Sequence, residues 1–411
     1  MNRSPLHEIA TGRLGSLFDE DMAIVRLQLQ NAVNGKRILA IGGAGSIGSS
    51  TVLEIAALRP DTLHIVDQNE NGLAELVRQM RSRPEGWSAR DFRTLPLDYG
   101  SATMAHFLRS EKPYDIVLNF AALKHVRSEK DPYSTLQIFE TNLAKQARLM
   151  RWLADTGFNG RFFTVSTDKA ANPSSIMGAT KRLMEHVLFN SSAAASLGGV
   201  RTSARFANVA FSNGSLLQAF EHRLARGDAM AVPRDTRRYF VSLGESGQIC
   251  AIAAGVAPGQ GIVIPKLVPQ EHLVLLQEIA EKFLHRNGFA PAYYDDEAAA
   301  CANVEAERRQ GRWPLLITPL DTAGEKPYEE FVTENEEIVE IGMPNLQAVR
   351  YLAADKAEID ASLNEIDELL DRTSRAAANL DKDRLKAIIA RVEPEFLATH
   401  RDSASNLDQR L

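Results

Sequence analysis

The stretch that most constrains the fold is a glycine-rich turn between an apolar run and a helical pattern. The run Arg37–Ile41 leads directly into Gly42-Gly43-Ala44-Gly45-Ser46-Ile47-Gly48, and the helical stretch Ser49–Leu58 follows. Glycines at this spacing allow a tight turn, and they let backbone N–H groups and a helix N-terminus approach a pyrophosphate without a Cβ in the way. We therefore expect a dinucleotide site here. Its predicted residues are Gly42, Gly45, Ser46, Ile47 and Gly48.

Short apolar runs alternate with helical stretches around this turn, as in a parallel sheet that helices cover on both faces. The expected strands are Arg37–Ile41, Leu63–Asp67, Phe92–Leu97, Ile116–Phe120, Arg161–Ser166 and Thr202–Val209. The expected helices are Ser49–Leu58, Gly72–Arg81, Ser101–Arg109, Leu136–Thr156 and Gly178–Asn190. This alternation predicts a doubly wound α/β fold of the Rossmann type.

The chain length predicts more than one domain, because 411 residues are too many for one small core. Asp19–Val33 has helical spacing, and we expect it to pack on the main domain, with a subunit contact as the alternative. Asp355–Arg391 indicates two helices with a break at Asn379-Leu380-Asp381. The predicted segments are an N-terminal helical arm (1–34), a Rossmann domain to which later segments can add strands (35–211), a smaller mixed substrate-binding domain (212–345) and a C-terminal helical extension (346–411).

Composition argues against several classes of partner. The formal net charge of -6 gives no general attraction to nucleic acid or to anionic membranes. Cys250 and Cys301 form no ligand cluster, so we expect neither a metal nor a disulfide. Neither a signal peptide nor a run of about 18 apolar residues is present. We therefore expect a cytoplasmic protein without a membrane span.

An acidic residue in the predicted second strand favours NAD over NADP. Asp67 stands about 20 residues after Gly48, where a carboxylate can bind both hydroxyls of the adenosine ribose. This carboxylate would repel a 2′-phosphate, and Gln68-Asn69 supplies no arginine to hold one. Asp98 is placed to meet the adenine amino group, with a loop cap as the alternative. Two small residues after the fourth strand, Ala121 and Ala122, leave room for the cofactor.

Several motifs together resemble the UDP-N-acetylglucosamine 4,6-dehydratases of polysaccharide and glycan biosynthesis, in the extended short-chain dehydrogenase/reductase superfamily. The resemblance covers residues 12 to 340. It rests on Gly42-x-x-Gly45-x-x-Gly48, Asn119–Val126, Ser166–Pro173, Met177–Arg182, Arg205–Val209, Arg238–Phe240 and Gly324–Glu330. It implies a nucleotide-sugar dehydratase that uses NAD, acts on a UDP-N-acetylhexosamine and forms a homo-oligomer. Larger members carry membrane helices ahead of this region, which we expect this chain to lack.

The resemblance also implies which residues act in catalysis. Most superfamily members use Tyr-x-x-x-Lys, but Met177 stands four residues before Lys181 here, as in one active branch of the dehydratases. In that branch the Thr-Asp-Lys motif performs the acid–base steps. Lys169 would remove the carbon-5 proton, Asp168 would protonate the departing 6-hydroxyl and Thr167 would bind the 4-oxygen. Lys181 would hold the nicotinamide ribose and place a positive charge near Lys169.

The substrate contacts leave alternatives open. The implied substrate-binding residues are Lys124, His125, Met177, Asn208 and Arg238. Lys124 and His125 are equally plausible as ordinary loop residues. Asp168 and Lys169 could form a solvated ion pair, but their place in this motif at a strand end favours the catalytic role. Arg238 is the preferred cation for a diphosphate, although Arg238 and Arg205 could both form structural ion pairs. The alternative functions are a nucleotide-sugar 4-epimerase or 4-ketoreductase, and a non-catalytic NAD-binding protein.

Overall fold

A nine-stranded sheet forms the centre of the molecule in the computed structural model, which describes residues 6–83, 89–124, 129, 131–319, 328–371 and 380–400. The strand order is β14-β15-β10-β6-β5-β4-β1-β2-β3. All neighbouring strands pair in parallel except at β15, which runs antiparallel to both its neighbours. The strands are β1 (Arg37–Ile41), β2 (Thr62–Val66), β3 (Asp91–Leu95), β4 (Ile116–Asn119), β5 (Arg161–Val165), β6 (Val200–Ala204), β10 (Gly261–Pro265), β14 (Ile338–Val339) and β15 (Leu346–Arg350).

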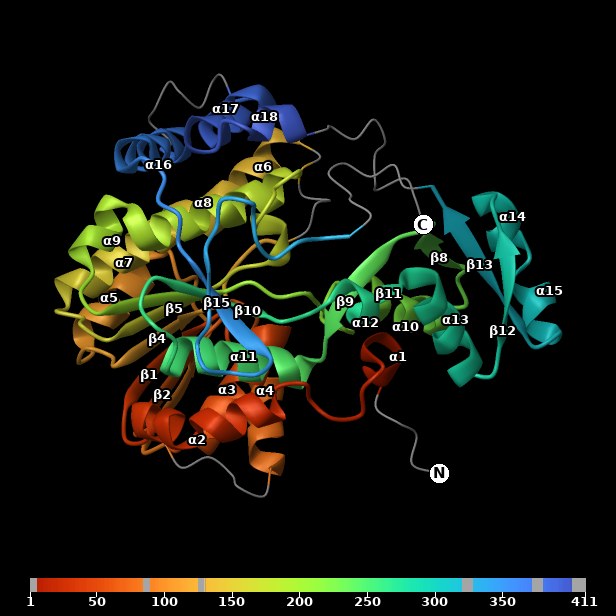
Figure 1. The fold of residues 1–411 in the computed structure, drawn as a ribbon, viewed down its shortest axis with the longest axis horizontal. Coiled ribbons are helices and arrows are strands. Elements are labelled where there is room, and N and C mark those ends of the chain that lie inside the picture. Colours follow the sequence, from red (N-terminus) through yellow and green to blue (C-terminus); the bar gives the residue numbers. More distant parts are fainter. Residues whose placement is uncertain are drawn as a thin grey trace.

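Helices cover both faces of this sheet (Figure 1). One face carries α2 (Asp19–Val33), α3 (Ser46–Ala57), α4 (Glu70–Ser82) and α11 (Leu243–Gly255). The other face carries α5 (Ala102–Ser110), α6 (Pro132–Phe139), the π-helical turn η2 (Glu140–Ala144), α7 (Lys145–Asp155), α8 (Ile176–Asn190) and α9 (Ser192–Ser196). Two C-terminal helices, α16 (Lys356–Leu370) and α17 (Lys382–Val392), lie outside α6 and α8, followed by α18 (Phe396–Thr399).

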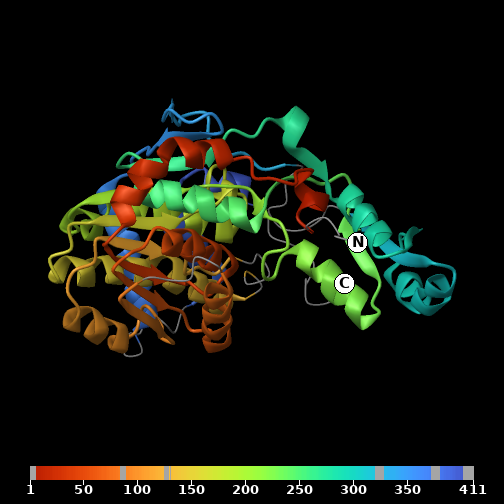
Figure 2. The same ribbon diagram turned by 90° about the horizontal axis from the view of Figure 1, so that it is seen from below.

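A smaller lobe lies beside the carboxyl ends of the strands (Figures 1 and 2). Its core packs Phe220, Phe283 and Trp313 together. One sheet, β12-β13-β8, consists of β8 (Met230–Pro233), β12 (Ala290–Tyr294) and β13 (Arg312–Thr318); a second, β11-β9-β7, consists of β7 (Asn208–Val209), β9 (Arg237–Val241) and β11 (Leu273–Leu275). The helices are α10 (Leu216–Arg226), α12 (Pro269–His272), α13 (Leu276–Arg286), α14 (Glu297–Ala302) and α15 (Val304–Arg309).

The doubly wound α/β prediction is confirmed, but the predicted strand Thr202–Val209 is divided. Only β6 lies in the main sheet, whereas β7 pairs with β9. Between them, Arg205 and Phe206 still contact the main domain, before Asn208 and Val209 pair with Phe240 and Val241 of β9. The Arg205 side chain enters a buried ion network, and the Phe206 oxygen accepts a hydrogen bond from the Asp168 nitrogen. The single helix expected over Leu136–Thr156 is the series α6, η2 and α7.

The N-terminal arm contacts both lobes. Val25, Leu29 and Val33 of α2 are buried in the main core, and Figures 1 and 2 both show α2 beside α11. The short helix α1 (Glu8–Thr11) packs against α13 and β9 in the smaller lobe. The described part of the arm therefore packs on this chain, and a subunit contact stays a prediction.

The domain boundaries stay predictions, but the main sheet draws on later segments than the Rossmann range 35–211. α11 and β10 come from the range expected for the substrate-binding domain, and β15 comes from the range expected to be helical. The two helices expected within Asp355–Arg391 are present as α16 and α17. Each begins at an aspartate, Asp355 or Asp381, whose side chain caps the first turn.

Candidate active site

The glycine turn joins β1 to α3 at the carboxyl end of the sheet. Gly42 has a φ of +71°, and a Cβ on it would lie 2.6 Å from the Ala121 nitrogen. A Cβ on Gly48 would lie 2.2 Å from the Gly42 oxygen, so α3 could not approach the turn with a larger residue there. Around Gly45 the nearest atom would be 3.4 Å away. Gly42 and Gly48 therefore serve internal packing, whereas Gly45 leaves the backbone open to a ligand.

Ser46 and Ile47 form the first turn of α3, directly after Gly45. The Ser46 hydroxyl accepts a hydrogen bond of 2.8 Å from the Asn213 nitrogen. The loop that begins the smaller lobe is thereby joined to the glycine turn.

A cavity of about 520 Å³ lies beside the glycine turn. Its charged lining residues are Asp67, Asp98, Glu140 and Lys145, so three carboxylates accompany one cation. A 2′-phosphate would meet this excess of negative charge. The predicted cofactor residues that the cavity brings together are Gly42, Gly45, Asp67, Asp98, Ala121 and Ala122.

The two aspartates of the cavity are held by hydrogen bonds. Asp67 accepts from the Ala44 nitrogen and from the Asn69 nitrogen, each at 2.9 Å. Asp98 accepts from the Gly100 nitrogen at 2.8 Å and from Lys145 Nζ at 2.6 Å. Asp98 is thus both a loop cap and part of the cavity wall.

The Thr167-Asp168-Lys169 motif follows β5 at the same edge of the sheet. Asp168 Oδ1 accepts hydrogen bonds from Thr167 Oγ1 at 2.7 Å, from the Lys169 nitrogen at 2.9 Å and from Lys169 Nζ at 3.2 Å. Asp168 Oδ2 is buried and has no hydrogen-bond partner among the described residues. Burying a carboxylate oxygen without a hydrogen-bond donor costs free energy. This oxygen is therefore suited to accepting a proton from a bound ligand or donating one to it.

The first turn of α8 packs directly on this motif. A Cβ on Gly178 would lie 2.7 Å from the Lys169 oxygen, so glycine permits the close contact. Met177 is buried next to it, and its nitrogen donates to Glu129 Oε1 at 2.8 Å. Burial raises the pKa of Glu129, against the opposing effect of the backbone N–H groups that it accepts from.

Lys181 lies one turn further along α8, and its amine is held at the end of β5. Nζ donates to the Val165 oxygen at 2.7 Å and lies 3.0 Å from Met184 Sδ. Burial lowers the pKa of Lys181 to about 7, despite the opposing charge of Glu185. Lys169 forms ion pairs with the carboxylates of Asp168 and Glu329. The effect of the Lys181 charge on Lys169 stays a prediction.

The remaining predicted residues lie apart from the cavity lining. Asn208 on β7 and Arg238 on β9 belong to one small sheet, and both are half-buried. Arg238 Nη1 donates to the Arg237 oxygen at 2.8 Å. Lys124 is exposed, directly after the lining residue Leu123. His125 lies outside the described residues.

Arg205 is fully buried in an ion network behind the motif. It donates to both oxygens of Glu185 and to both oxygens of Glu336. Glu185 also accepts from Ser166 Oγ at 2.6 Å. Arg205 therefore has the structural ion pairs that were one of its two predicted roles.

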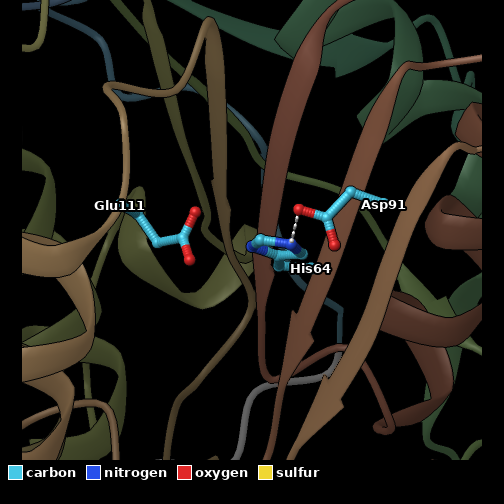
Figure 3. Close-up of side chains that lie close together, drawn as sticks. All are labelled: His64, Asp91 and Glu111. Atoms are coloured by element: carbon cyan, nitrogen blue, oxygen red, sulfur yellow. Dashed lines mark ion pairs between the residues drawn. The ribbon is translucent and has the colours of Figure 1, made fainter.

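A second polar cluster, His64, Asp91 and Glu111, lies towards the amino ends of the strands (Figure 3). His64 Nε2 is 3.1 Å from Asp91, while Arg93 pairs with both carboxylates and Arg37 with Glu111. These arginines supply the positive charge that a metal ion would otherwise bring. We assign no metal to this cluster.

Sequence reasoning missed four charged residues of the site, of which Glu140 and Lys145 line the cavity. Lys145 approaches Asp98 across Gly100, and Glu129 supports the start of α8. Glu329 lies 4.0 Å from Lys169 Nζ. Glu329 stands within the Gly324–Glu330 motif, which was a signal for the site without an assigned role.

A comparison with protein families now identifies the chain's relatives. The family model described as "polysaccharide biosynthesis protein" matches residues 38–350. The chain belongs to this polysaccharide biosynthesis protein family.

Curated relatives of this polysaccharide biosynthesis protein are distant. The uncharacterized membrane protein MJ1061 of Methanocaldococcus jannaschii is 28% identical, over 75% of this chain and 84% of its own. The probable polysaccharide biosynthesis protein EpsC of Bacillus subtilis is 26% identical, over 85% of this chain and 54% of EpsC. A UDP-N-acetylglucosamine 4,6-dehydratase (inverting) of Campylobacter jejuni strain 81-176 is 26% identical, over 62% of this chain and 73% of its own. The chain thus spans about half the length of EpsC.

Solved structures share the fold of this family member. Pen from Bacillus thuringiensis has a TM-score of 0.61 at 22% identity, covering 79% of this chain and 91% of Pen. A dTDP-glucose 4,6-dehydratase double mutant, DesIV of Streptomyces venezuelae, has a TM-score of 0.51 at 18% identity, covering 72% of this chain and 87% of its own. Among the helices that the structure describes, none is long and apolar enough to cross a membrane.

Proposed function

We propose that the chain is an NAD-dependent 4,6-dehydratase of a nucleotide-linked hexosamine, with UDP-N-acetylglucosamine as the expected substrate. One observation carries the proposal. Asp168 presents a buried carboxylate oxygen without a partner, beside the amine of Lys169 and at the end of β5. An acid and a base side by side are what elimination of water from a sugar needs. The Campylobacter jejuni relative supports the choice of substrate at 26% identity.

The residues present fit NAD. Gly42 and Gly48 create the tight turn, Gly45 leaves the backbone accessible, and the N-terminus of α3 faces the turn. Asp67 and Asp98 line the adjoining cavity, which suits ribose hydroxyls and an adenine amino group. When bound, NAD supplies an acceptor for the hydride of carbon 4 and returns that hydride to carbon 6.

The side chains of the motif divide the remaining chemistry. Once carbon 4 is a ketone, the carbon-5 proton is acidic, and the neutral amine of Lys169 accepts it. Asp168 in its protonated form donates to the departing 6-hydroxyl, which leaves as water. Thr167 Oγ1, which donates to Asp168 Oδ1, accepts from the 4-hydroxyl and passes that proton to Asp168 as carbon 4 is oxidised. Asp168 delivers this proton to the departing 6-hydroxyl, and Lys169 returns its proton to carbon 5, so both groups end in the state in which they began.

Three further residues complete the proposed site. Met177 lies beside the motif as a packing residue, because a thioether cannot accept the proton of a sugar hydroxyl. Lys181 would contact the nicotinamide ribose. Its amine would either give up its hydrogen bond to the Val165 oxygen or donate to that oxygen and to the ribose together. Arg238 would bind the diphosphate with Asn208 nearby on the neighbouring strand.

The test is incubation of the purified protein with NAD and UDP-N-acetylglucosamine, followed by mass spectrometry and NMR of the product. Loss of one water with a new 6-methyl signal is the expected result. A product of unchanged mass with an inverted carbon 4 would show a 4-epimerase instead. An unchanged sugar in the presence of bound NAD would favour a non-catalytic protein.

A further inference from the structure

The segment 328–336 precedes β14 of the main sheet and carries a charged contact to the Thr167-Asp168-Lys169 motif through Glu329. Arg205 holds this segment, because its Nη1 donates to the Phe331 oxygen at 3.0 Å and to Glu336 Oε2 at 2.7 Å. The Thr333 nitrogen donates to Glu336 Oε2 at 3.0 Å. Phe331 packs on Tyr239, with ring centroids 5.4 Å apart. The segment is therefore anchored at its far end by buried contacts.

Glu329 is the residue of this segment that approaches Lys169. Its side chain is only 7% exposed, and its Oε1 lies 4.0 Å from Lys169 Nζ. The same Nζ lies 3.2 Å from Asp168 Oδ1. The lysine amine thus lies between carboxylates from two distant parts of the chain.

The two distances have different chemical meanings. At 3.2 Å, Lys169 donates a hydrogen bond to Asp168, whereas 4.0 Å to Glu329 is too long for one. Charge attraction still acts at 4.0 Å, and it acts strongly where little water is present. In its protonated form, the amine of Lys169 is therefore attracted by Glu329 without donating a hydrogen bond to it.

This attraction bears on the oxygen that Asp168 keeps unpaired. Oδ1 already accepts three hydrogen bonds, and Oδ2 has no partner among the described residues. Without Glu329, the full charge of Lys169 would fall on Asp168. The amine could then move across both carboxylate oxygens and engage Oδ2. Oδ2 would then be occupied by the amine and no longer open to the substrate.

We propose that Glu329 is a positioning residue, whose carboxylate keeps the amine of Lys169 from closing onto Asp168 Oδ2. The 328–336 segment, held by Arg205, places it. This inference deepens the proposed dehydratase function and rests on it for its catalytic consequence. The contact between Glu329 and Lys169 can also be tested without turnover.

The chain offers a matched control for the catalytic test. Glu330 is the next residue, is exposed, and accepts from Asn172 Nδ2 at 2.6 Å rather than from Lys169. Glu329→Gln should reduce kcat for carbon-5 hydrogen exchange in deuterated water by about 10- to 100-fold, with KM little changed, because misplacement of a reacting group costs factors of this size. Glu330→Gln should stay within about twofold. Glu329→Asp keeps the charge and should recover part of the lost rate.

A double-mutant cycle on unfolding supplies the readout that is independent of catalysis. Glu329→Gln and Lys169→Met should be coupled by about twofold or more in the unfolding equilibrium constant, and Glu330→Gln with Lys169→Met should not. The inference would be overturned if Glu329 and Lys169 showed no coupling, or if Glu329→Gln left the rate of carbon-5 exchange unchanged. A different outcome is a wild-type protein that shows the Glu329–Lys169 coupling but no turnover. That result would overturn the proposed function and the catalytic part of the inference, and it would establish the contact.

Discussion

Arg205 and Glu336 form a buried bidentate ion pair, in which Nη1 to Oε2 and Nη2 to Oε1 both measure 2.7 Å. Glu185 completes the network from the other side of the guanidinium. The network joins α8 to the 328–336 segment behind the catalytic motif. Loss of Arg205 would leave the buried carboxylates of Glu185 and Glu336 with less positive charge beside them.

Arg205→Met is therefore expected to lower the free energy of unfolding by about 3 to 5 kcal/mol, the usual cost of breaking a buried ion pair from one side. Urea denaturation followed by circular dichroism measures it. Arg309→Met is the control, since Arg309 is 76% exposed and pairs with Glu305 at the surface. That change should cost less than about 1 kcal/mol. Equal effects of the two variants would contradict the structural role of Arg205.

The same network predicts how stability depends on pH. Burial by itself raises the pKa of Glu336, but the hydrogen bonds and charge of Arg205 outweigh it and lower that pKa from 4.5 to about 2. A lowered carboxyl pKa contributes stability that is complete above about pH 4.5 and is lost as the pH falls towards about 2. Glu336→Gln should flatten this part of the stability curve. Thermal melts of both proteins across this pH range test the prediction, and identical slopes would count against it.

Asp67 should set the preference for NAD over NADP. Asp67→Ser combined with Gln68→Arg removes a carboxylate from the cavity and adds a cation beside it. The ratio of the two dissociation constants should narrow by about tenfold or more, a difference of about 1.4 kcal/mol. Calorimetric titration with both cofactors checks this, with Gln68→Arg alone as the control. Tighter binding of NADP by the wild type would show that Asp67 is not at the ribose.

Met177 should be a packing residue. Met177→Leu conserves volume in a buried position, so turnover should stay within about tenfold of wild type. Steady-state assays with UDP-N-acetylglucosamine measure it. A loss of about a thousandfold would mean that the sulfur takes part in the reaction.

The roles of Lys169 and Asp168 should be distinguishable by isotope exchange at carbon 5. Lys169→Met is expected to leave NAD binding intact and to suppress carbon-5 exchange by about 100- to 10,000-fold. Asp168→Asn should permit the exchange and slow loss of the 6-hydroxyl, since an amide is a poor proton donor. NMR in deuterated water follows both steps. If Lys169→Met keeps near-normal exchange, the base lies elsewhere and Lys124 or His125 becomes the next candidate.

Local sequence determined the cofactor half of the site. Gly42, Gly45 and Gly48 are close neighbours in the chain, and their roles depend on one strand, one turn and one helix. The alternation of apolar runs and helical stretches likewise defined the doubly wound sheet, because each element shows its own periodicity. Asp67 belongs to the same unit, and its presence in the cavity wall followed from the end of β2.

Only the tertiary structure decided which charges meet. Lys169 and Glu329 are far apart in the chain, and Arg205 was equally compatible with a ligand or with ion pairs until Glu185 and Glu336 were placed around it. The start of β7 was decided in the same way, since Asn208 and Val209 pair with Phe240 and Val241 of β9, which come from a later part of the chain. Periodicity reports which face of an element is buried. It carries no information on which distant side chain fills the space opposite, because that depends on how the elements pack.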